Sequence, residues 1–159
     1  GTANIDFTSI PATFKHLQIR LLARTTHPSG TDGDYLDMQF NSDTGSNYAT
    51  HQISADGSSV SAAAFTSQNS MYPSRVAATG LAANIFGCII IDILDYSSTT
   101  KYKTVRQLGA YDANGSGLLR FASCLWMNTN AITSIKLEAG SGTGFEQYSQ
   151  IALYGIKGS

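Results

Sequence analysis

Charge is what this sequence has least of. Charged residues make up 13% of its 159 residues, about half of the ~25% usual for soluble domains, and Ser, Thr, Gly and Asn take their place. With a formal net charge of −1 and a sequence pI near 6.3, the composition provides no electrostatic attraction for nucleic acid or an anionic membrane. Weak charge also means weak repulsion between copies, so self-association is favoured.

Long apolar runs and processing signals are scarce as well. The most apolar run, IFGCIIIDIL, is interrupted by Asp92 and falls short of the ~20 residues of a membrane-spanning helix. The N-terminus does not resemble a signal peptide, and Gly1 in place of Met indicates a processed chain or a residue left from cloning. We therefore expect no membrane insertion.

Cysteine and histidine are too few and too scattered for the common catalytic or zinc sites. Cys88 and Cys124 lie in apolar segments, which favours two buried free thiols and leaves a single disulfide open. His16, His27 and His51 form no His-x-His or His-Glu-x-x-His motif, and there is no Cys-x-x-Cys or Gly-x-Ser-x-Gly. The sequence therefore predicts no enzyme, no cofactor and no metal.

What the sequence does have is period-two alternation of apolar and polar residues, which is typical of half-buried strands. Two triplets are expected on inner sheet faces because a slip of one residue would expose each whole set: Leu17, Ile19 and Leu21, and Leu36, Met38 and Phe40. The segment IFGCIIIDILDY is apolar on both faces, which predicts a central strand covered on both sides. Trp126 is expected to be a core anchor.

Turn-forming segments separate these strands at the 8–12-residue spacing of a sandwich or barrel. They are HPSGTDGD, SDTGSN, SADGSS, YDANGSG and AGSGTG. Residues 54–84 are interpreted as a long excursion. We expect residues 1–159 to form a single all-β domain, a jelly-roll-like antiparallel β-sandwich of about eight or nine strands.

Acidic and amide residues cluster at several turns, where calcium, sugar or turn geometry are the alternatives. Asp32, Asp34 and Asp37, or Asp112 and Asn114, could contribute calcium ligands, but neither set has the closing glutamate of an EF-hand loop. Asp and Asn are also common in tight turns, which is the reading we favour.

Other polar motifs are interpreted in the same way. Asp92 and Asp95 fall on opposite faces of a strand, and Glu138 and Glu146 are the only glutamates, which is a poor set for glycoside hydrolysis. The glycine run at 140–144 lacks the lysine and helix of a phosphate cradle and predicts a hairpin. Asn114-Gly115-Ser116 is formally a glycosylation acceptor but is also a strong hairpin signal.

Tyrosine is the commonest aromatic residue. Exposed tyrosines can stack on sugars, but in β proteins they more often lie in strands and interfaces. Six tyrosines are expected near loops: Tyr48, Tyr72, Tyr96, Tyr102, Tyr111 and Tyr148.

The segment FNSDTGSNYATH, residues 40–51, predicts a hairpin. Phe40 would be the last inward residue of its strand, Asn41 to Asn47 would bond their own turn, Thr44-Gly45 would form the corner, and Tyr48 would begin the return strand.

Several stretches together resemble a domain of tailed-bacteriophage virion proteins, over about Ile5 to Gly158. They are TSIPATFKHLQIRLLAR, MQFNSDTGSNYATH, IDILDYSSTTKYKTVRQLGAYDANGSG, LWMNTNAITSIKLEA and SQIALYGIKG, the most specific parts being FNSDTGSNY and LYGIKG. Domains of this family are head-decoration or tail-associated β-sandwich proteins. The resemblance brings no catalytic or binding residues with it.

The resemblance implies a non-enzymatic structural protein on the phage particle surface, a capsid decoration (cement) or tail-associated protein that acts through protein–protein contacts. Its expected partners are copies of itself, with a trimer favoured and an N-terminal segment reaching a neighbour, and the major capsid protein or other virion proteins. The alternative is a carbohydrate-binding module, such as a receptor-binding tail-fibre domain that meets host-surface carbohydrate. It should show an exposed coplanar pair of aromatic rings in a concave face.

Overall fold

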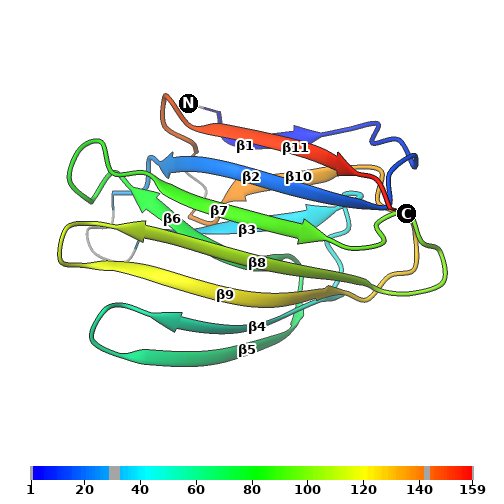
Figure 1. The fold of residues 1–159 in the computed structure, drawn as a ribbon, viewed down its shortest axis with the longest axis horizontal. Coiled ribbons are helices and arrows are strands. Elements are labelled where there is room, and N and C mark those ends of the chain that lie inside the picture. Colours follow the sequence, from blue (N-terminus) through cyan, green and yellow to red (C-terminus); the bar gives the residue numbers. More distant parts are fainter. Residues whose placement is uncertain (1, 29–32, 142–143, 159) are drawn as a thin grey trace.

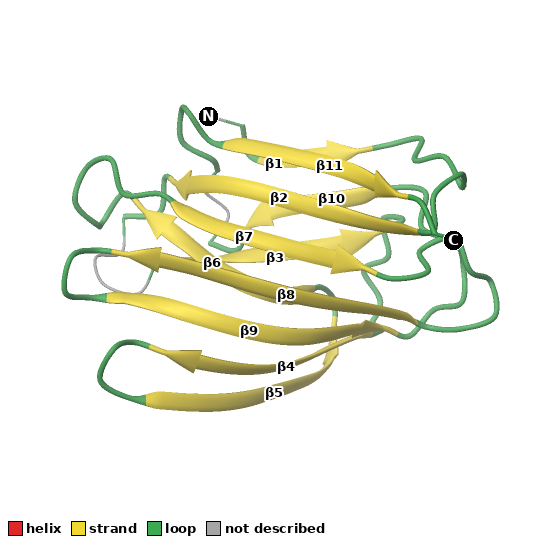
Figure 2. Cartoon of the chain, viewed as in Figure 1, coloured by secondary structure: helices red, strands yellow, loops and turns green. Residues whose placement is uncertain are grey.

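In the computed structural model, which describes residues 2–28, 33–141 and 144–158, every regular element is a β-strand (Figure 2). The strands are β1 (Asn4–Phe7), β2 (His16–Thr25), β3 (Asp34–Phe40), β4 (Tyr48–Ala55), β5 (Val60–Gln68), β6 (Met71–Ala78), β7 (Gly87–Ile93), β8 (Lys103–Asp112), β9 (Gly117–Trp126), β10 (Ile135–Ala139) and β11 (Gln150–Ile156).

Hydrogen bonds join these strands into one open, mostly antiparallel sheet. Its order is β1-β10-β3-β6-β2-β7-β8-β9-β4-β5, with β11 also paired to β2. The one parallel pair, β2 with β6, comprises only Arg24–Ala77 and Thr25–Ala78. This narrow joint separates a four-strand part (β1-β10-β3-β6) from a seven-strand part (β11-β2-β7-β8-β9-β4-β5), and the four-strand part lies behind the other in Figure 1.

The apolar core lies between these two parts. β6 crosses β8 and β9 without pairing to them, and a Cβ added at Gly109 of β8 would lie 2.5 Å from Ser74 Oγ of β6. Residues of both parts belong to one buried cluster. The two triplets expected to point inward are confirmed, since their members are at most 4% exposed: Leu17, Ile19, Leu21, Leu36, Met38 and Phe40. Trp126 is fully buried in the same cluster.

The all-β prediction is confirmed, but two details of it are wrong. The described residues form 11 strands rather than eight or nine, and hydrogen bonding joins these strands into one open sheet, so the two-sheet jelly roll stays a proposal. Residues 54–84 are not a long excursion, because they contain β5 and β6. β5, with the sequence VSAAAFTSQ, is a largely exposed edge strand, and small or polar residues at such an edge leave little apolar pattern to read.

The prediction that IFGCIIIDILDY forms a strand covered on both sides is also wrong. β7 lies between β2 and β8 as a central strand, with Ile89, Ile91 and Ile93 buried in the core. However, its other face is open, because Cys88 is exposed and Ile90 is 43% exposed. The sequence of β7 is apolar on both faces, but this chain covers only one of them.

Candidate functional site

The polar side chains of the turn at residues 40–51 form hydrogen bonds within the turn and to nearby residues of the fold. Asp43 accepts hydrogen bonds from Trp126 Nε1 (2.8 Å), from the Gly45 N–H (2.9 Å) and from Asn47 Nδ2. Burial alone would raise the pKa of Asp43, but these hydrogen bonds hold it below its ordinary value. The Tyr48 hydroxyl accepts from the Phe40 N–H at 3.0 Å. The turn is therefore structural, as the sequence predicts.

The same turn is not a hairpin, however. β3 pairs with β10 and β6, whereas β4 pairs with β5 and β9, so the turn carries the chain from one part of the sheet to the other. Its left-handed residues are Asn41 (φ 51°) and Ser42 (φ 56°) rather than Thr44-Gly45. Asn41 is held by its side chain, which accepts from the Thr133 and Ser134 N–H groups. Asn tolerates this backbone region without glycine.

The calcium candidates do not assemble into a site in the described residues. Asp34 accepts a hydrogen bond from Ser141 Oγ at 2.8 Å, while Asp32 lies outside the described residues. Asp112 accepts from the Asn114 N–H at 2.7 Å, in a hairpin with Asn114 and Gly115 at positive φ. Across residues 2–28, 33–141 and 144–158, no group of three His, Cys, Asp or Glu could hold a metal ion. The absence of a metal stays a prediction.

Two further acids, Asp92 and Asp95, bond to nearby side chains. Asp92 accepts from Gln18 Nε2 (2.8 Å) and Arg106 (3.0 Å), and Asp95 pairs with Lys15 at 2.6 Å and with Lys101.

Asp37 is held unfavourably, because it is largely buried and its register partner on β10 is Glu138. Burial, then the carboxylates of Glu138 and Asp34, raise the pKa of Asp37 to about 6. Lys136 offsets part of this rise while bonded to Glu138 at 2.7 Å. Asp37, Glu138 and Lys136 line a small cavity of about 150 Å³ together with Gln39, Asn69 and Ser70.

The glycine run at 140–144 connects β10 to β11, which pair with different strands, so the hairpin prediction there is wrong. Residues 142–143 lie outside the described part of the chain.

The thiols and imidazoles are likewise apart. Both cysteines are free, but only Cys124 is buried, so the expected burial of Cys88 is wrong. Burial raises the pKa of the Cys124 thiol to about 11, although Thr50 bonds to it. His16 accepts from the Asp95 N–H at 3.0 Å, and three strands separate its strand β2 from β4, which carries His51.

Three cations inside the molecule serve the fold. Arg24 donates to the carbonyls of residues 81, 82 and 85, at 2.8–2.9 Å. Lys103 donates to the carbonyls of residues 101 and 129, both at 3.1 Å, and burial lowers its pKa. Arg120 Nε donates to Ser54 Oγ at 3.0 Å. Carbonyl and hydroxyl acceptors disperse each charge without forming a reactive pair.

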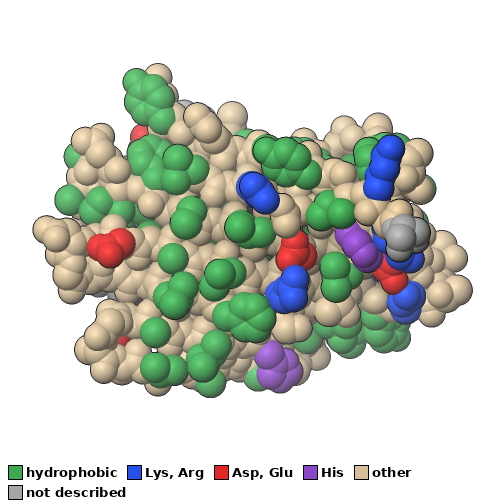
Figure 3. Space-filling view, in the orientation of Figure 1, with side chains coloured by type: hydrophobic (Ala, Val, Ile, Leu, Met, Phe, Trp, Pro, Cys, Tyr) green, Lys and Arg blue, Asp and Glu red, His purple; other side chains and the backbone are tan. Residues whose placement is uncertain are grey.

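The most unusual feature of the surface is the outer face of the seven-strand part, which we call the outer face. Residues that pair across neighbouring strands form rows on this face. Two such rows consist almost entirely of apolar side chains. The first row is Ala152, Arg20, Ile90, Leu108, Phe121, Ile53 and Ala62, and the second is Gln150, Leu22, Cys88, Ala110, Leu119, Ala55 and Val60. Figure 3 shows these apolar side chains gathered over one half of this face.

The other half of the outer face is polar, and its opposite charges are paired. The next row of paired residues is Tyr154, Gln18, Asp92, Arg106, Ser123, His51 and Ala64. Asp92 bonds to both Gln18 and Arg106 within it, and Arg20 Nε donates to Gln18 at 2.9 Å. The face is thus divided into an apolar half and a polar half with balanced charges.

The exposed apolar area is large for a single chain. Seven large side chains of the apolar half are between 43% and 70% exposed: Leu22, Ile53, Val60, Ile90, Leu108, Leu119 and Phe121. Taking roughly 80–100 Å² for half of such a residue, together they present on the order of 560–700 Å². That is at or above the ~300–600 Å² of the largest patch on typical monomers and near the ~800 Å² that one partner contributes to a standard interface.

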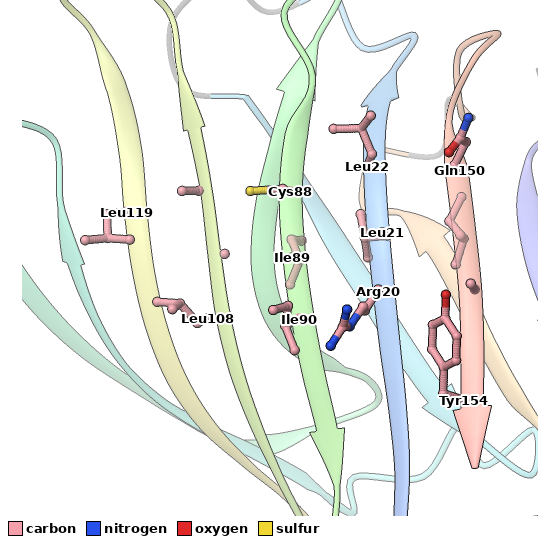
Figure 4. Close-up of a pocket in the computed structure, with 14 residues that line it drawn as sticks. Arg20, Leu21, Leu22, Cys88, Ile89, Ile90, Leu108, Leu119, Gln150 and Tyr154 are labelled. Atoms are coloured by element: carbon pink, nitrogen blue, oxygen red, sulfur yellow. The ribbon is translucent and has the colours of Figure 1, made fainter. Parts of the chain in front are cut away.

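A shallow hollow of about 500 Å³ lies within the outer face, across β11, β2, β7, β8 and β9. Figure 4 shows Leu22, Cys88, Ile90, Leu108 and Leu119 lining it from neighbouring strands. Its polar lining side chains are Arg20, Gln150 and Tyr154, and the Arg20 guanidinium stands 5.9 Å from the Tyr154 ring.

The tyrosines do not form a stacking platform. Tyr48, Tyr96 and Tyr111 are buried, so their rings are not available for stacking on a sugar. Tyr102 and Tyr148 are exposed, at 53% and 76%. Among the described rings in contact, the only near-parallel pair is Tyr48 with Trp126, at 17°, and both are fully buried.

The sequence of β7 contains a signal of the outer face. Cys88 and Ile90 are apolar on one face of the strand, and Ile89 and Ile91 are apolar on the other, which indicates a strand covered on two sides. The pattern does not say whether the second cover belongs to the same chain.

Comparison with known proteins identifies no relative: no protein-family model matches the chain, and neither the curated proteins nor the solved structures contain a match. In the described part of the chain, no helix is long and apolar enough to cross a membrane.

Proposed function

We propose that this chain is a non-catalytic structural protein of a tailed-bacteriophage particle, a decoration or tail-associated component that acts through its outer face. The observation that carries the proposal is the apolar half of that face, where a central strand with apolar residues on both sides is covered on only one. Large apolar patches bordered by polar residues are typical of protein–protein interfaces. The location on a phage particle rests on the resemblance of the sequence.

We also propose that the two parts of the sheet act as the two layers of a jelly-roll-like sandwich. The joint between them is only two residue pairs long, and one buried cluster fills the space between them. This arrangement supports a rigid outer face, because the inward residues of β7, β8 and β9 are anchored in the core.

Two substitutions that place charge in the apolar half test the proposal. In the particle that carries this chain, Leu108→Glu with Phe121→Glu should lower the amount of chain retained after gradient purification at least tenfold. Both side chains are about half exposed, so the repulsion between the two carboxylates, which lie opposite each other on β8 and β9, should cost the fold only about 0.2–1 kcal/mol, while a buried carboxylate at the interface would not be tolerated. Ser123→Glu, on the same exposed face of β9 but in the polar half, is the matched control and should be retained.

Retention of the double variant at the wild-type level would contradict the proposal. Binding of the isolated chain to a panel of glycans, lost on removal of Tyr154 or Arg20, would instead favour the carbohydrate-binding alternative.

A further inference from the structure

We propose that β5 pairs edge to edge with β5 of a second copy of this chain, antiparallel, about a two-fold axis at Ala62. The inference rests on the proposed structural function and names one of its partners. It predicts an even number of copies in place of the trimer expected from the sequence.

β5 is an open edge without the usual protection. It is last in the strand order and pairs only with β4, and its nine residues include no charge and no proline. Edge strands of natural proteins are normally short, charged, interrupted by proline or bulged. The register shift in β5 lies at its C-terminal end, opposite Tyr48 and Thr50, where Ser67 has a φ of 55°. Residues 60–64 are regular.

The hydrogen-bonding phase of the β4–β5 hairpin determines which backbone groups face the open edge. The Asp56 N–H donates to the Ser59 carbonyl at 3.2 Å, so these residues form a hydrogen-bonded pair, and such pairs alternate along an antiparallel ladder. By that alternation three pairs are not bonded across the hairpin: Ala55–Val60, Ile53–Ala62 and His51–Ala64. The N–H and C=O groups of Val60, Ala62 and Ala64 therefore point to the open edge.

These six groups are self-complementary. In an antiparallel pair centred on Ala62, Val60 of one copy lies opposite Ala64 of the other, and the two Ala62 residues face each other. Every one of the six donors and acceptors then gains a partner, as in a regular ladder. The contact is isologous, so it closes at two copies instead of propagating. The three side chains are small and uncharged, and no like charges meet across the new ladder.

The outer face explains why a second copy fits better than an unrelated strand. The apolar row through Leu108, Phe121 and Ile53 ends at Ala62, and the two-fold axis at Ala62 continues it into the same row of the other copy. Val60, which is 70% exposed, gains an apolar neighbour. Pairing thus joins two outer faces into one broader surface for the particle to cover.

Amide hydrogen exchange of the full chain, read residue by residue at 1 and 100 μM, tests the proposal. At the higher concentration we expect the amides of Val60, Ala62 and Ala64 to exchange at least tenfold more slowly, as the mass of a dimer appears. Ser61 and Ala63 amides, which face β4, should be protected at both concentrations and serve as internal controls. Ala62→Pro removes the central outward N–H while keeping a small apolar side chain, and it should keep the chain monomeric.

Three results would overturn the inference: a monomer at 100 μM, association without slowing of these three amides, or an Ala62→Pro variant that associates like the wild type. The exchange pattern of the wild type decides the matter even where the proline variant fails to fold. Failure here leaves the particle-retention test of Leu108→Glu with Phe121→Glu intact, because that test reports on the face and not on the edge.

Discussion

At the residue scale, much of the structure follows from alternation and from local hydrogen bonding. Leu17 to Leu21 and Leu36 to Phe40 point inward as their period of two predicts. The turn around Asp43 was also interpretable as structural, because Asp and Asn bond their own backbone. The bond from Trp126 to Asp43 was not predictable. It joins residues 83 apart in the chain, and alternation does not specify which strand ends meet.

One residue makes stability depend on pH in a direction opposite to most acids. Burial and neighbouring carboxylates raise the pKa of Asp37 in the folded chain to about 6, above the ordinary value of 3.8. The folded chain therefore holds this proton over a range where the unfolded chain has lost it, and the free energy of unfolding falls as pH rises from about 4 to 6.

We predict that Asp37→Asn removes this loss. The difference in unfolding free energy, variant minus wild type, should rise by about 1–3 kcal/mol between pH 4 and 6.5 and then level off. Urea denaturation across that range measures it. Asp92→Asn is the control: although burial raises the pKa of Asp92, hydrogen bonds from Gln18 and Arg106 hold it below its ordinary value, so the stability that this carboxylate contributes is lost only below about pH 4 and the difference between that variant and wild type should stay nearly level from pH 4 to 6.5. Equal slopes for the two variants would contradict this assignment.

At the element scale, the sequence predicts where most strands lie but not which strands pair with each other. β2 and β3 lie where alternating segments predict strands, and β7 lies where an apolar segment does. β5 and β6 were missed because Ala and Ser are weak strand signals. The turn at 40–51 looked like a hairpin by composition, yet it links strands of different parts of the sheet, since turn residues encode a local bend and not the pairing on either side.

The close crossing of β6 over β8 should depend on Gly109. A Cβ there would lie 2.5 Å from Ser74 Oγ and 2.9 Å from the Ile89 side chain, so Gly109→Val should reduce the free energy of unfolding by about 1–3 kcal/mol through overpacking. The urea midpoint, with the m-value checked for change, measures this.

Ala110→Val, one residue on and on the outer face, is the matched control and should change stability by less than about 0.5 kcal/mol. If both variants behave alike, β6 does not pack closely on β8.

At the scale of the whole molecule, the fold leaves one sheet face incomplete. The seven-strand part is covered by the four-strand part on its inner side, while its outer side presents half-exposed Leu, Ile and Phe side chains beside charges that neutralise one another. Low overall charge, which the sequence displays from the start, is consistent with a surface meant to be covered. Composition could indicate association, but only the three-dimensional register shows that the apolar residues of six strands form one surface.

The most direct test of a covered outer face is the reactivity of Cys88. Its thiol is exposed in the hollow of that face, whereas Cys124 is buried with its pKa raised to about 11, so a maleimide should label Cys88 alone in the isolated folded chain. We predict that labelling of Cys88 slows at least tenfold when the chain is part of its particle, and that it returns to the free rate when the particle is dissociated without unfolding the chain. Equal labelling rates in the particle and in the isolated chain would contradict the account.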